Sequence, residues 1–118
     1  MASLIVDGPD LVVHLSWLEK LGAFRGDLHV PLTDVRSVEV DPQPWSSLRG
    51  FRSPGTGIPG VIALGIRRHS GGWDFAALHG QRPAVRVDLD RQSHFGRLIV
   101  SVRDPDKSVA AIHATTGV

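Results

Sequence analysis

Residues 49–60 form the stretch of this sequence with the most distinctive candidate chemistry. They read R-G-F-R-S-P-G-T-G-I-P-G, with two arginines, four glycines and two prolines. Guanidinium groups bind carboxylates and phosphates in bidentate fashion, and glycines let the backbone approach a ligand closely. We expect a long surface loop here that carries or adjoins the candidate binding residues, which are Trp45, Arg49, Phe51, Arg52 and Thr56.

Part of this stretch approaches the phosphate-binding pattern G-x-x-x-x-G-K-[ST], from Gly50 through Gly55 to Thr56. The lysine that would contact the terminal phosphates is missing, and Pro54 removes one backbone N–H. The residues after Gly60 read as a strand, whereas a phosphate loop precedes a helix. These departures argue against nucleotide binding. They leave two interpretations, a plain connection or a surface for a carboxylate, a phosphate or a peptide.

Other residues with catalytic or metal-binding potential are not arranged for such chemistry. The six histidines never occur at i, i+2 or i, i+4 spacing, and the chain has no cysteine, so we expect no metal site and no disulfide. No G-x-S-x-G elbow is present. Asp88 and Asp90 share one strand face but precede a turn, which favours solvated charges over a catalytic pair. We therefore expect a non-catalytic protein without a cofactor.

Charge is distributed unevenly along the chain. The net charge of +1 argues against a dedicated nucleic-acid binder, yet residues 1–41 carry seven acids and three bases, and residues 49–86 carry six arginines and one acid. The basic segment is suited to an anionic partner or membrane surface, or it is one face of a domain whose two faces differ. Residues 1–7 lack a basic n-region and no apolar run is long enough to cross a bilayer, so we expect a cytoplasmic protein.

Short strands separated by turn residues make up most of the remaining pattern. The clearest is 84–89, where Val85, Val87 and Leu89 alternate with polar residues as in a half-buried strand. Asp7-Gly8-Pro9-Asp10 favours a turn between two N-terminal strands. Further strands are expected at 25–32, 34–40, 61–66, 73–78 and 97–102.

Two helices are expected among the strands. Ser16 and Glu19 form a capping box for a short helical corner that Gly22 ends after about one turn. Asp104, followed by Pro105, caps a C-terminal helix that runs to about His113 and buries Val109 and Ile112.

The aromatic residues are numerous enough to anchor the core of a domain of this size. We expect most of them to be buried and Trp45, next to Pro44, to be exposed. The set consists of Trp17, Trp45, Trp73, Phe24, Phe51, Phe75 and Phe95. Together the elements predict a mainly β single domain over 1–118, a barrel or sandwich of about seven antiparallel strands with one C-terminal helix.

The element order resembles the pleckstrin-homology-like superfold. Residues 17–21, 54–63 and 97–105 also resemble segments of a group of small, mainly actinobacterial proteins. The resemblance implies a fold that hosts lipid, peptide and protein binding, and no single activity. Members that bind phosphoinositides use basic residues near the first strand turn. Here that turn, residues 7–10, is acidic, which argues against headgroup binding there.

The sequence therefore favours a binding or scaffold module. The leading hypothesis is protein or peptide recognition, including self-association, through residues 45–60 or an exposed sheet edge. The first alternative is weak docking on an anionic membrane through the arginines of residues 49–86. The second alternative is a small-ligand carrier or an enzyme with a pocket at the open end of the barrel.

Overall fold

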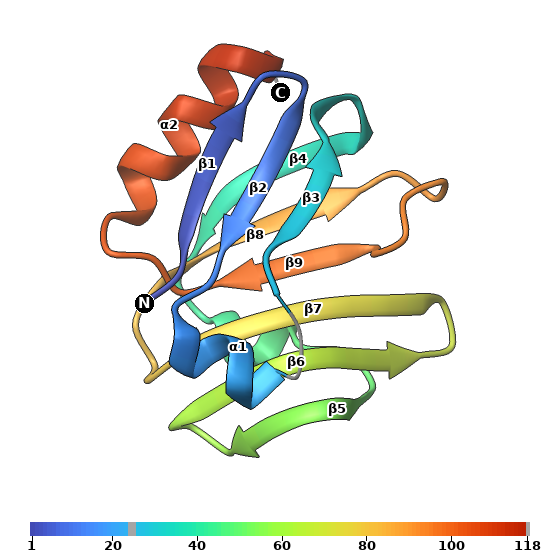
Figure 1. Ribbon diagram of the computed structural model, residues 1–118, viewed down its shortest axis with the longest axis vertical. Helices are drawn as coiled ribbons and strands as arrows, with labels where there is room; N and C mark the ends of the chain where they lie inside the picture. Colours follow the sequence, from blue (N-terminus) through green and yellow to red (C-terminus); the bar gives the residue numbers. More distant parts are fainter. Residues whose placement is uncertain (24–25, 118) are drawn as a thin grey trace.

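The computed structural model describes residues 1–23 and 26–117, and for residues 51–54 it describes the backbone alone. Within these residues the chain forms nine strands, two α-helices and two short 3-10 helices (Figure 1). The elements are β1 (Ser3–Asp7), β2 (Asp10–His14), α1 (Trp17–Ala23), β3 (Leu28–Pro31), η1 (Leu32–Asp34), β4 (Val35–Asp41), η2 (Pro44–Ser47), β5 (Phe51–Ile58), β6 (Ile62–His69), β7 (Gly72–His79), β8 (Ala84–Leu89), β9 (Arg97–Val100) and α2 (Pro105–Thr116).

The strands form two sheets. Strands β1, β2 and β3 make an antiparallel sheet in that order, and β4 to β9 make a six-stranded sheet in the order β4-β8-β9-β7-β6-β5. Strand β9 returns between β8 and β7 and pairs in parallel with β7, whereas the other described pairs are antiparallel. The mainly β class and the C-terminal helix are confirmed.

The expectation of about seven antiparallel strands is wrong in number and in direction. The described chain has nine strands and one parallel pair, and both sheets are open in the strand order. Strand β5 accounts for part of the difference, because it lies where a loop was expected. The parallel pair follows from the path of the chain, since β9 inserts between β8 and β7 and runs antiparallel to β8. No local residue pattern encodes such a choice of neighbour.

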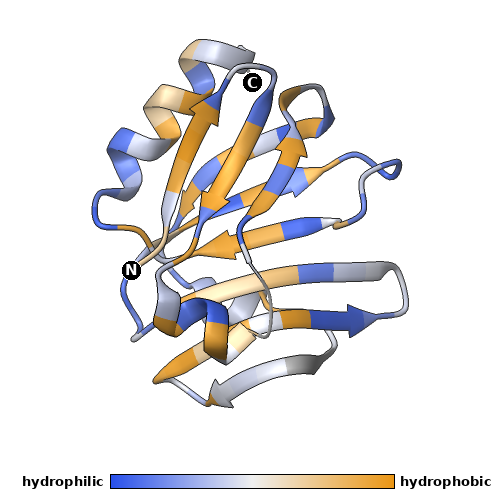
Figure 2. Cartoon of the chain, in the orientation of Figure 1, coloured by the Kyte–Doolittle hydropathy of each residue, from blue (hydrophilic) through white to orange (hydrophobic). Residues whose placement is uncertain are grey.

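The main hydrophobic core joins the two sheets to α2. Leu11 of β2, Val30 of β3, Phe75 of β7, Val87 of β8 and Ile112 of α2 belong to one cluster of buried residues. Helix α2 packs on β1, β4 and β8, and the apolar colouring in Figure 2 follows the strands around this centre. Each fully buried side chain of this size contributes about 1.5–3 kcal/mol. The alternation predicted for β8 is confirmed, because its inward valines are fully buried.

Strand β4 departs from simple alternation. Val35 and Val38 are both buried although they are three residues apart, and Arg36 is exposed between them. The pairing of β4 with β8 shifts between Val35 and Ser37. A bulge of this kind inserts one residue into the strand, so both valines reach the core. Simple alternation along a strand would place them on opposite faces.

Helix α2 forms with the caps that the sequence predicts. The Asp104 carboxylate accepts from the Lys107 N–H at 3.2 Å, Pro105 occupies the first turn, and Val109 and Ile112 are buried. The helix continues to Thr116, three residues beyond the expected end, and closes at Gly117 with φ of 73°. Glycine adopts this left-handed conformation without the strain of a Cβ atom.

Helix α1 also forms, but it is longer than expected and it faces in an unexpected direction. The capping box is confirmed: the Glu19 carboxylate accepts from the Ser16 N–H at 3.0 Å, and the Ser16 hydroxyl accepts from the Glu19 N–H at 3.3 Å. The helix continues through Gly22, where a Cβ atom would lie 2.7 Å from the Leu64 side chain. Glu19 and Ala23 are buried, whereas Trp17 is 70% exposed.

The aromatic residues divide into core and surface groups. Phe75 and Phe95 are buried as expected, with their ring centroids 6.2 Å apart. The expectation is wrong for Trp17, because α1 turns its carboxylate side toward the protein. Trp45 and Trp73 are half-buried. Phe24 and the side chain of Phe51 lie outside the described residues. Among the described helices, none is both long and apolar enough to span a membrane.

Candidate functional site

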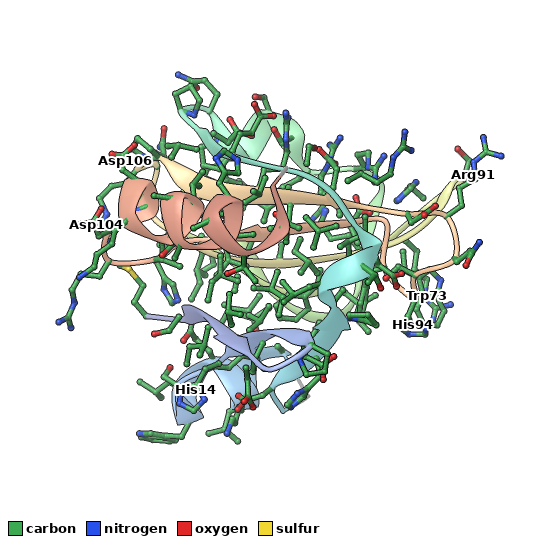
Figure 3. All side chains as sticks on the ribbon, turned by 90° about the horizontal axis from the view of Figure 1, so that it is seen from above. His14, Trp73, Arg91, His94, Asp104 and Asp106 are labelled. Atoms are coloured by element: carbon green, nitrogen blue, oxygen red, sulfur yellow. The ribbon has the colours of Figure 1, made fainter. Side chains whose placement is uncertain are left out.

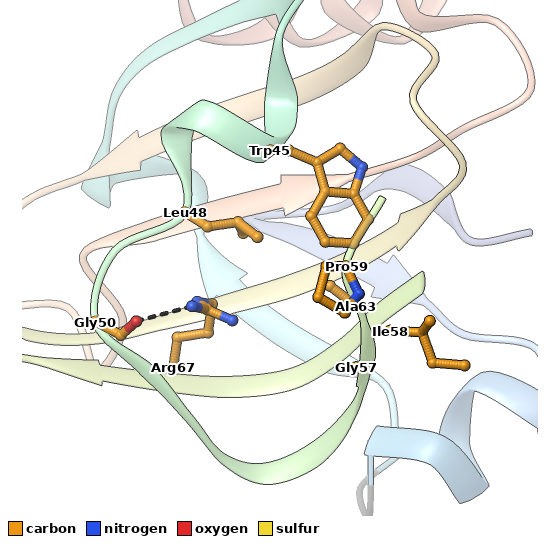
Figure 4. A pocket seen from close by; sticks show the side chains of 8 residues that line it. All are labelled: Trp45, Leu48, Gly50, Gly57, Ile58, Pro59, Ala63 and Arg67. Atoms are coloured by element: carbon orange, nitrogen blue, oxygen red, sulfur yellow. Dashed lines mark hydrogen bonds between the residues drawn. The ribbon is translucent and has the colours of Figure 1, made fainter. Parts of the chain in front are cut away.

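Residues of the stretch 45–60, Trp45 among them, border a groove on the outer face of the six-stranded sheet. Helix η2 places Trp45 over the sheet, and the indole Nε1 donates to the Gly80 carbonyl at 2.7 Å, which fixes the orientation of the ring. The groove beside it has a volume of about 590 Å³ (Figure 4). Its lining residues are Trp45, Leu48, Gly50, Gly57, Ile58, Pro59, Ala63 and Arg67. We call this cavity the Trp45 groove.

Small residues of β5 and β6 contribute to the Trp45 groove. Gly57 pairs with Ala63 across the two strands, so both belong to one transverse row. Ala63 belongs to a second apolar cluster, which also contains Leu78, Ala84 and Ile99 and against which Trp45 and Leu48 pack. An aromatic wall beside residues with little or no side chain leaves room for an apolar group of a ligand. Trp45, expected to be exposed, is instead a half-buried, hydrogen-bonded wall of the groove.

The segment that leads into β5 is held by Arg67. Its Nη2 donates to the Gly50 carbonyl at 2.8 Å and its Nε donates to the Arg49 carbonyl at 3.2 Å. Gly50 has φ of 70°, and a Cβ atom there would lie 1.8 Å from the Arg68 carbonyl oxygen. Only glycine fits this position, because the two backbones approach so closely. The glycine at 50 thus has a structural purpose and is not part of a phosphate loop.

The expected long loop at 49–60 is wrong for most of its length. Residues 51–58 form β5, the terminal strand of the six-stranded sheet, and β5 pairs with β6 through a register shift between Arg52 and Gly55. Proline and glycine reduce strand propensity, but they are tolerated in edge strands and at bulges. The turn from Ile58 to Val61 contains Gly60 at φ of 77°. The residue types that indicated a loop instead mark an irregular edge strand.

Arg49 is held in an internal ion pair. Its Nε and Nη2 each donate to one oxygen of Asp74 at 2.7 Å, and Asp74 is 1% exposed. The hydrogen bonds to Asp74, together with its charge, raise the pKa of Arg49 although partial burial opposes the shift. Gly96 leaves room for this pair, since a Cβ atom there would lie 3.3 Å from the Arg49 Nη2.

His69 completes the surroundings of Asp74. Its Nε2 lies 3.1 Å from the Asp74 Oδ1, and its Nδ1 accepts from the Gly71 N–H at 3.0 Å. Because Nδ1 is an acceptor, Nε2 carries the hydrogen that points to Asp74. Arg49 and His69 therefore both satisfy one buried carboxylate. The described ion pair of Arg49 is with Asp74 and not with an acid of residues 1–41, so Arg49 stabilises the fold, and it also lines the second cavity described below.

Arg49 and Thr56 do not line the Trp45 groove. The Thr56 hydroxyl donates to the Gly22 carbonyl of α1 at 2.8 Å, and its strand partner is Leu64 of the main core. Successive residues of a strand point to opposite faces, so Thr56 faces α1 while Gly57 faces the groove. The side chains of Phe51 and Arg52 lie outside the described residues. Of the five candidates, the groove thus includes Trp45 among its lining residues.

Most of the groove residues were not singled out individually from the sequence. Gly50, Gly57, Ile58 and Pro59 belong to the stretch 49–60, so its unusual composition did point to their location. Ala63 and Arg67 lie outside that stretch, and Arg67 carried only the general signal of the arginines of residues 49–86. Their contribution depends on the pairing register of β5 and β6, which a sequence pattern does not specify when the strand is rich in glycine.

A second cavity, of about 840 Å³, opens at the β6–β7 turn and the segment between β8 and β9. Trp73 and His94 meet there edge to face, with centroids 5.1 Å apart, and the Arg68 guanidinium lies 4.9 Å from the Trp73 ring centroid. Figure 3 shows Trp73, His94 and Arg91 at this end of the molecule. Asp90 also lines the cavity, so its lining carries both charge signs.

The arginines of residues 49–86 are engaged within the molecule to a large extent. Arg86 pairs with Glu39, Arg49 pairs with Asp74, and Arg68 stacks on Trp73. In the same way Asp88 accepts from Arg97 at 2.7 Å, so the expectation that Asp88 is a solvated edge charge is wrong. Charges that face one another across a sheet attract each other and leave less field for an external partner. The basic segment is consequently weaker as an anionic docking surface than its sequence indicates.

Four of the histidines have identifiable polar partners. His14 lies 2.9 Å from Asp27, His79 lies 2.9 Å from Glu19, and His113 contacts the Val38 carbonyl at 2.9 Å, while His69 contacts Asp74 as described above. Among the described residues, no group of three or more side chains of the metal-binding types is close enough to hold a metal ion. These histidines act as partners of individual groups in the fold.

Comparison with protein-family models, with curated proteins and with solved structures finds no match for this chain. The geometry of the groove and of its surroundings therefore carries the functional argument.

Proposed function

We propose that this protein is a non-catalytic binding module that recognises an apolar segment of a protein or peptide in the Trp45 groove. The observation that carries the proposal is the groove itself, with its half-buried tryptophan wall and its glycine and alanine lining. A cavity of about 590 Å³ lies within the range of roughly 300–1,000 Å³ that is typical of ligand sites. Because the indole is already held by Gly80, binding requires little ordering of this wall.

The position of the Trp45 groove favours an extended partner. The groove lies beside β5, the terminal strand of the sheet, and its lining includes the turn from Ile58 to Pro59. Pro54 and the register shift in β5 discourage open-ended pairing of strands, so the groove is a more specific recognition feature than the strand edge. Three expectations stay predictions within this proposal: assignment to the pleckstrin-homology-like superfold, a cytoplasmic location and a bacterial origin.

The two alternative functions have less support. Docking on an anionic membrane depends on free basic charge, and much of that charge is paired inside the molecule. A small-ligand carrier would use the same groove, which lies on the outer face of a sheet and not at the end of a barrel. Small ligands and peptides share the apolar chemistry that this groove offers.

Selection from a random peptide library displayed on phage tests the proposal. We expect the wild type to enrich peptides with a common apolar residue and Ile58→Lys to enrich none of them. An apolar ligand in the groove would remove water from the charged lysine, which costs free energy of binding. Val61→Lys is the matched control, since Val61 is 57% exposed in the same turn, Ile58 is 55% exposed, and Val61 does not line the groove.

Two results would contradict the proposal. One is a wild-type selection without any common peptide, and the other is equal binding of a selected peptide to the wild type and to Ile58→Lys. A thermal-shift screen of small apolar compounds runs in parallel. Stabilisation by such compounds, without peptide enrichment, would favour the carrier function instead.

A further inference from the structure

The most unusual surface of the molecule is the outer side of α1 with the neighbouring β5–β6 turn. Among the described residues, seven large apolar side chains are classed as exposed, and five of them belong to these two elements. Helix α1 packs on β5 and β6, and the Thr56 hydroxyl joins β5 to the end of α1. Figures 1 and 2 show α1 beside the β5–β6 end of the sheet, with apolar colour on both. We name this surface the α1 patch, formed by Trp17, Leu18, Leu21, Ile58 and Val61.

The exposure of these residues results from the way α1 is anchored. Glu19 occupies the buried side, where its carboxylate accepts from the Ser16 N–H, lies 2.9 Å from the His79 Nε2 and lies 3.9 Å from the N-terminal amine. In a helix, Leu18 and Leu21 are directed away from the side that carries Glu19 and Ala23. A surface helix normally buries its apolar stripe and exposes its charges. Helix α1 does the opposite, and the polar anchors hold it so.

The area of the α1 patch is suited to a protein interface. Five side chains of this size, each more than half exposed, present roughly 500 Å² of apolar surface, comparable with the largest patch of a typical monomer. A stable interface of standard size buries roughly 800 Å² from each partner. A polar rim around the patch would have to supply the remaining area. Exposed tryptophan and a surrounding rim are the usual anatomy of such an interface.

The charges at the rim favour a second copy of this chain as the occupant. Lys20 of α1 forms an ion pair with Asp27 at 3.6 Å, so the rim contains both charge signs. A rim of mixed charge allows the patch to face itself across a two-fold axis without net repulsion, and two-fold dimers are the commonest oligomers. An anionic lipid surface would instead require a surplus of basic residues around the patch.

We propose that two copies of this protein form a two-fold dimer through the α1 patch. Trp17 and the two leucines of each copy pack on the patch of the other, which removes the largest exposed apolar area of the described chain from water. The dimer leaves Trp45 itself outside the interface. This proposal does not depend on the peptide-binding function, although Ile58 borders both surfaces.

Sedimentation velocity of the full chain, from low micromolar to millimolar concentration, measures the association. The wild type is expected to form dimers as the concentration rises. Leu18→Glu and Leu21→Glu should each weaken dimerisation at least about tenfold, because each places two like charges in an apolar interface. Ile5→Glu is the matched control, because Ile5 is also exposed, at 47%, but lies on β1 outside the patch. The Ile5→Glu variant should dimerise as strongly as the wild type.

We expect the charge variants to be folded, because both leucines are exposed in the monomer, and unfolding curves check this expectation. A wild type that stays monomeric throughout the concentration range would overturn the proposal. So would dimers that Leu18→Glu and Leu21→Glu leave unchanged. Monomeric wild type that sediments with phosphatidylcholine vesicles, while Leu18→Glu does not, would identify a lipid surface as the occupant and likewise overturn it.

Discussion

The two helices of this protein bury opposite kinds of side chain. Helix α2 turns Val109 and Ile112 into the main core and exposes most of its polar residues. Helix α1 turns Glu19 toward the protein and leaves Trp17 and two leucines in solvent. Both helices carry a side-chain cap at the N-terminus, so capping does not distinguish them. The difference lies in what holds each helix to the sheet, apolar burial for α2 and a set of polar contacts for α1.

The comparison indicates different purposes for the two helices. Helix α2 stabilises the fold, because its apolar side chains are already covered. Helix α1 leaves its large apolar side chains exposed and buries a carboxylate. Burial of a carboxylate costs free energy, because the charged group loses its contact with water. The exposed apolar surface of α1 is therefore better suited to contact with a partner than to stabilisation of the monomer. Measurements of stability at matched positions therefore test whether the helices differ as described.

The largest expected effect comes from truncation of the apolar face of α2. Ile112 is 1% exposed, so Ile112→Ala should lower the free energy of unfolding by about 3 kcal/mol through lost burial and a cavity. Leu21→Ala removes a side chain of similar size from α1, where it is 63% exposed. We expect a change of at most about 0.5 kcal/mol for the monomer. Urea unfolding at low protein concentration measures both, and equal losses would contradict the contrast between the helices.

The next effect concerns the polar anchor of α1. Glu19→Gln should lower the free energy of unfolding by about 2 kcal/mol at neutral pH, because the charged hydrogen bonds to a buried carboxylate are lost. Glu39→Gln is the matched control, since the Glu39 side chain is 52% exposed on β4. Its effect should stay below about 1 kcal/mol. A Glu19→Gln variant as stable as the control would show that the polar contacts do not anchor α1.

The pH dependence of the same variant gives a second measure of this anchor. Burial raises the pKa of Glu19, but the Ser16 N–H, His79 and the N-terminal amine outweigh it, so the pKa lies below its ordinary value of 4.5. The unfolded chain then binds more protons in acid than the folded chain does. The stability from Glu19 is present above pH 4.5 and is lost as the pH falls through the lowered pKa.

Thermal unfolding, measured from neutral pH into the acid range, should therefore show that the difference in stability between the wild type and Glu19→Gln becomes smaller as the pH falls. A residual acid dependence will remain in the variant. The pKa of Asp27 is also lowered, mainly by the Leu15 N–H and in spite of some desolvation. A constant difference between the two proteins down to the acid range would contradict the assignment to Glu19.

A smaller effect is expected at the cap of α2. Asp104→Ala removes the acceptor of the Lys107 N–H and should cost about 1 kcal/mol. Asp106→Ala, in the first turn of the same helix, removes a charge near the positive end of the helix dipole and should cost no more than about 0.5 kcal/mol. Urea unfolding distinguishes the two. The reverse order would mean that the helix dipole matters more here than the capping hydrogen bond.

The smallest effect is expected where β5 holds the end of α1. Thr56→Val removes the hydrogen bond to the Gly22 carbonyl and should cost roughly 0.5 kcal/mol globally. Hydrogen exchange of the α1 amides should accelerate, while exchange in α2 should stay unchanged. Thr115→Val is the control on an exposed turn of α2. Unchanged exchange in α1 would show that Thr56 does not fasten this helix.

Much of the local structure could be predicted from short stretches of sequence. The alternation in 84–89, the turn at 7–10, the capping box at Ser16 and the cap at Asp104 are all confirmed. Each depends on residues within a few positions of one another. The Trp45 groove was also located in part, since the stretch 49–60 includes half of the residues that line it. The conformation predicted for the stretch 49–60 was wrong, because an edge strand tolerates the same glycines and proline as a loop.

Other features were decided by the tertiary structure alone. Asp74 lies 25 residues from Arg49 and His79 lies 60 residues from Glu19, and no local pattern relates these partners. The sequence by itself determined most of the strands, turns and caps, β5 excepted, because backbone preferences and side-chain periodicity act over short distances. The tertiary structure decided that Arg49 pairs with Asp74, that Trp45 forms a groove wall and that Trp17 faces solvent. Those outcomes depend on which distant segments the folded chain brings into contact.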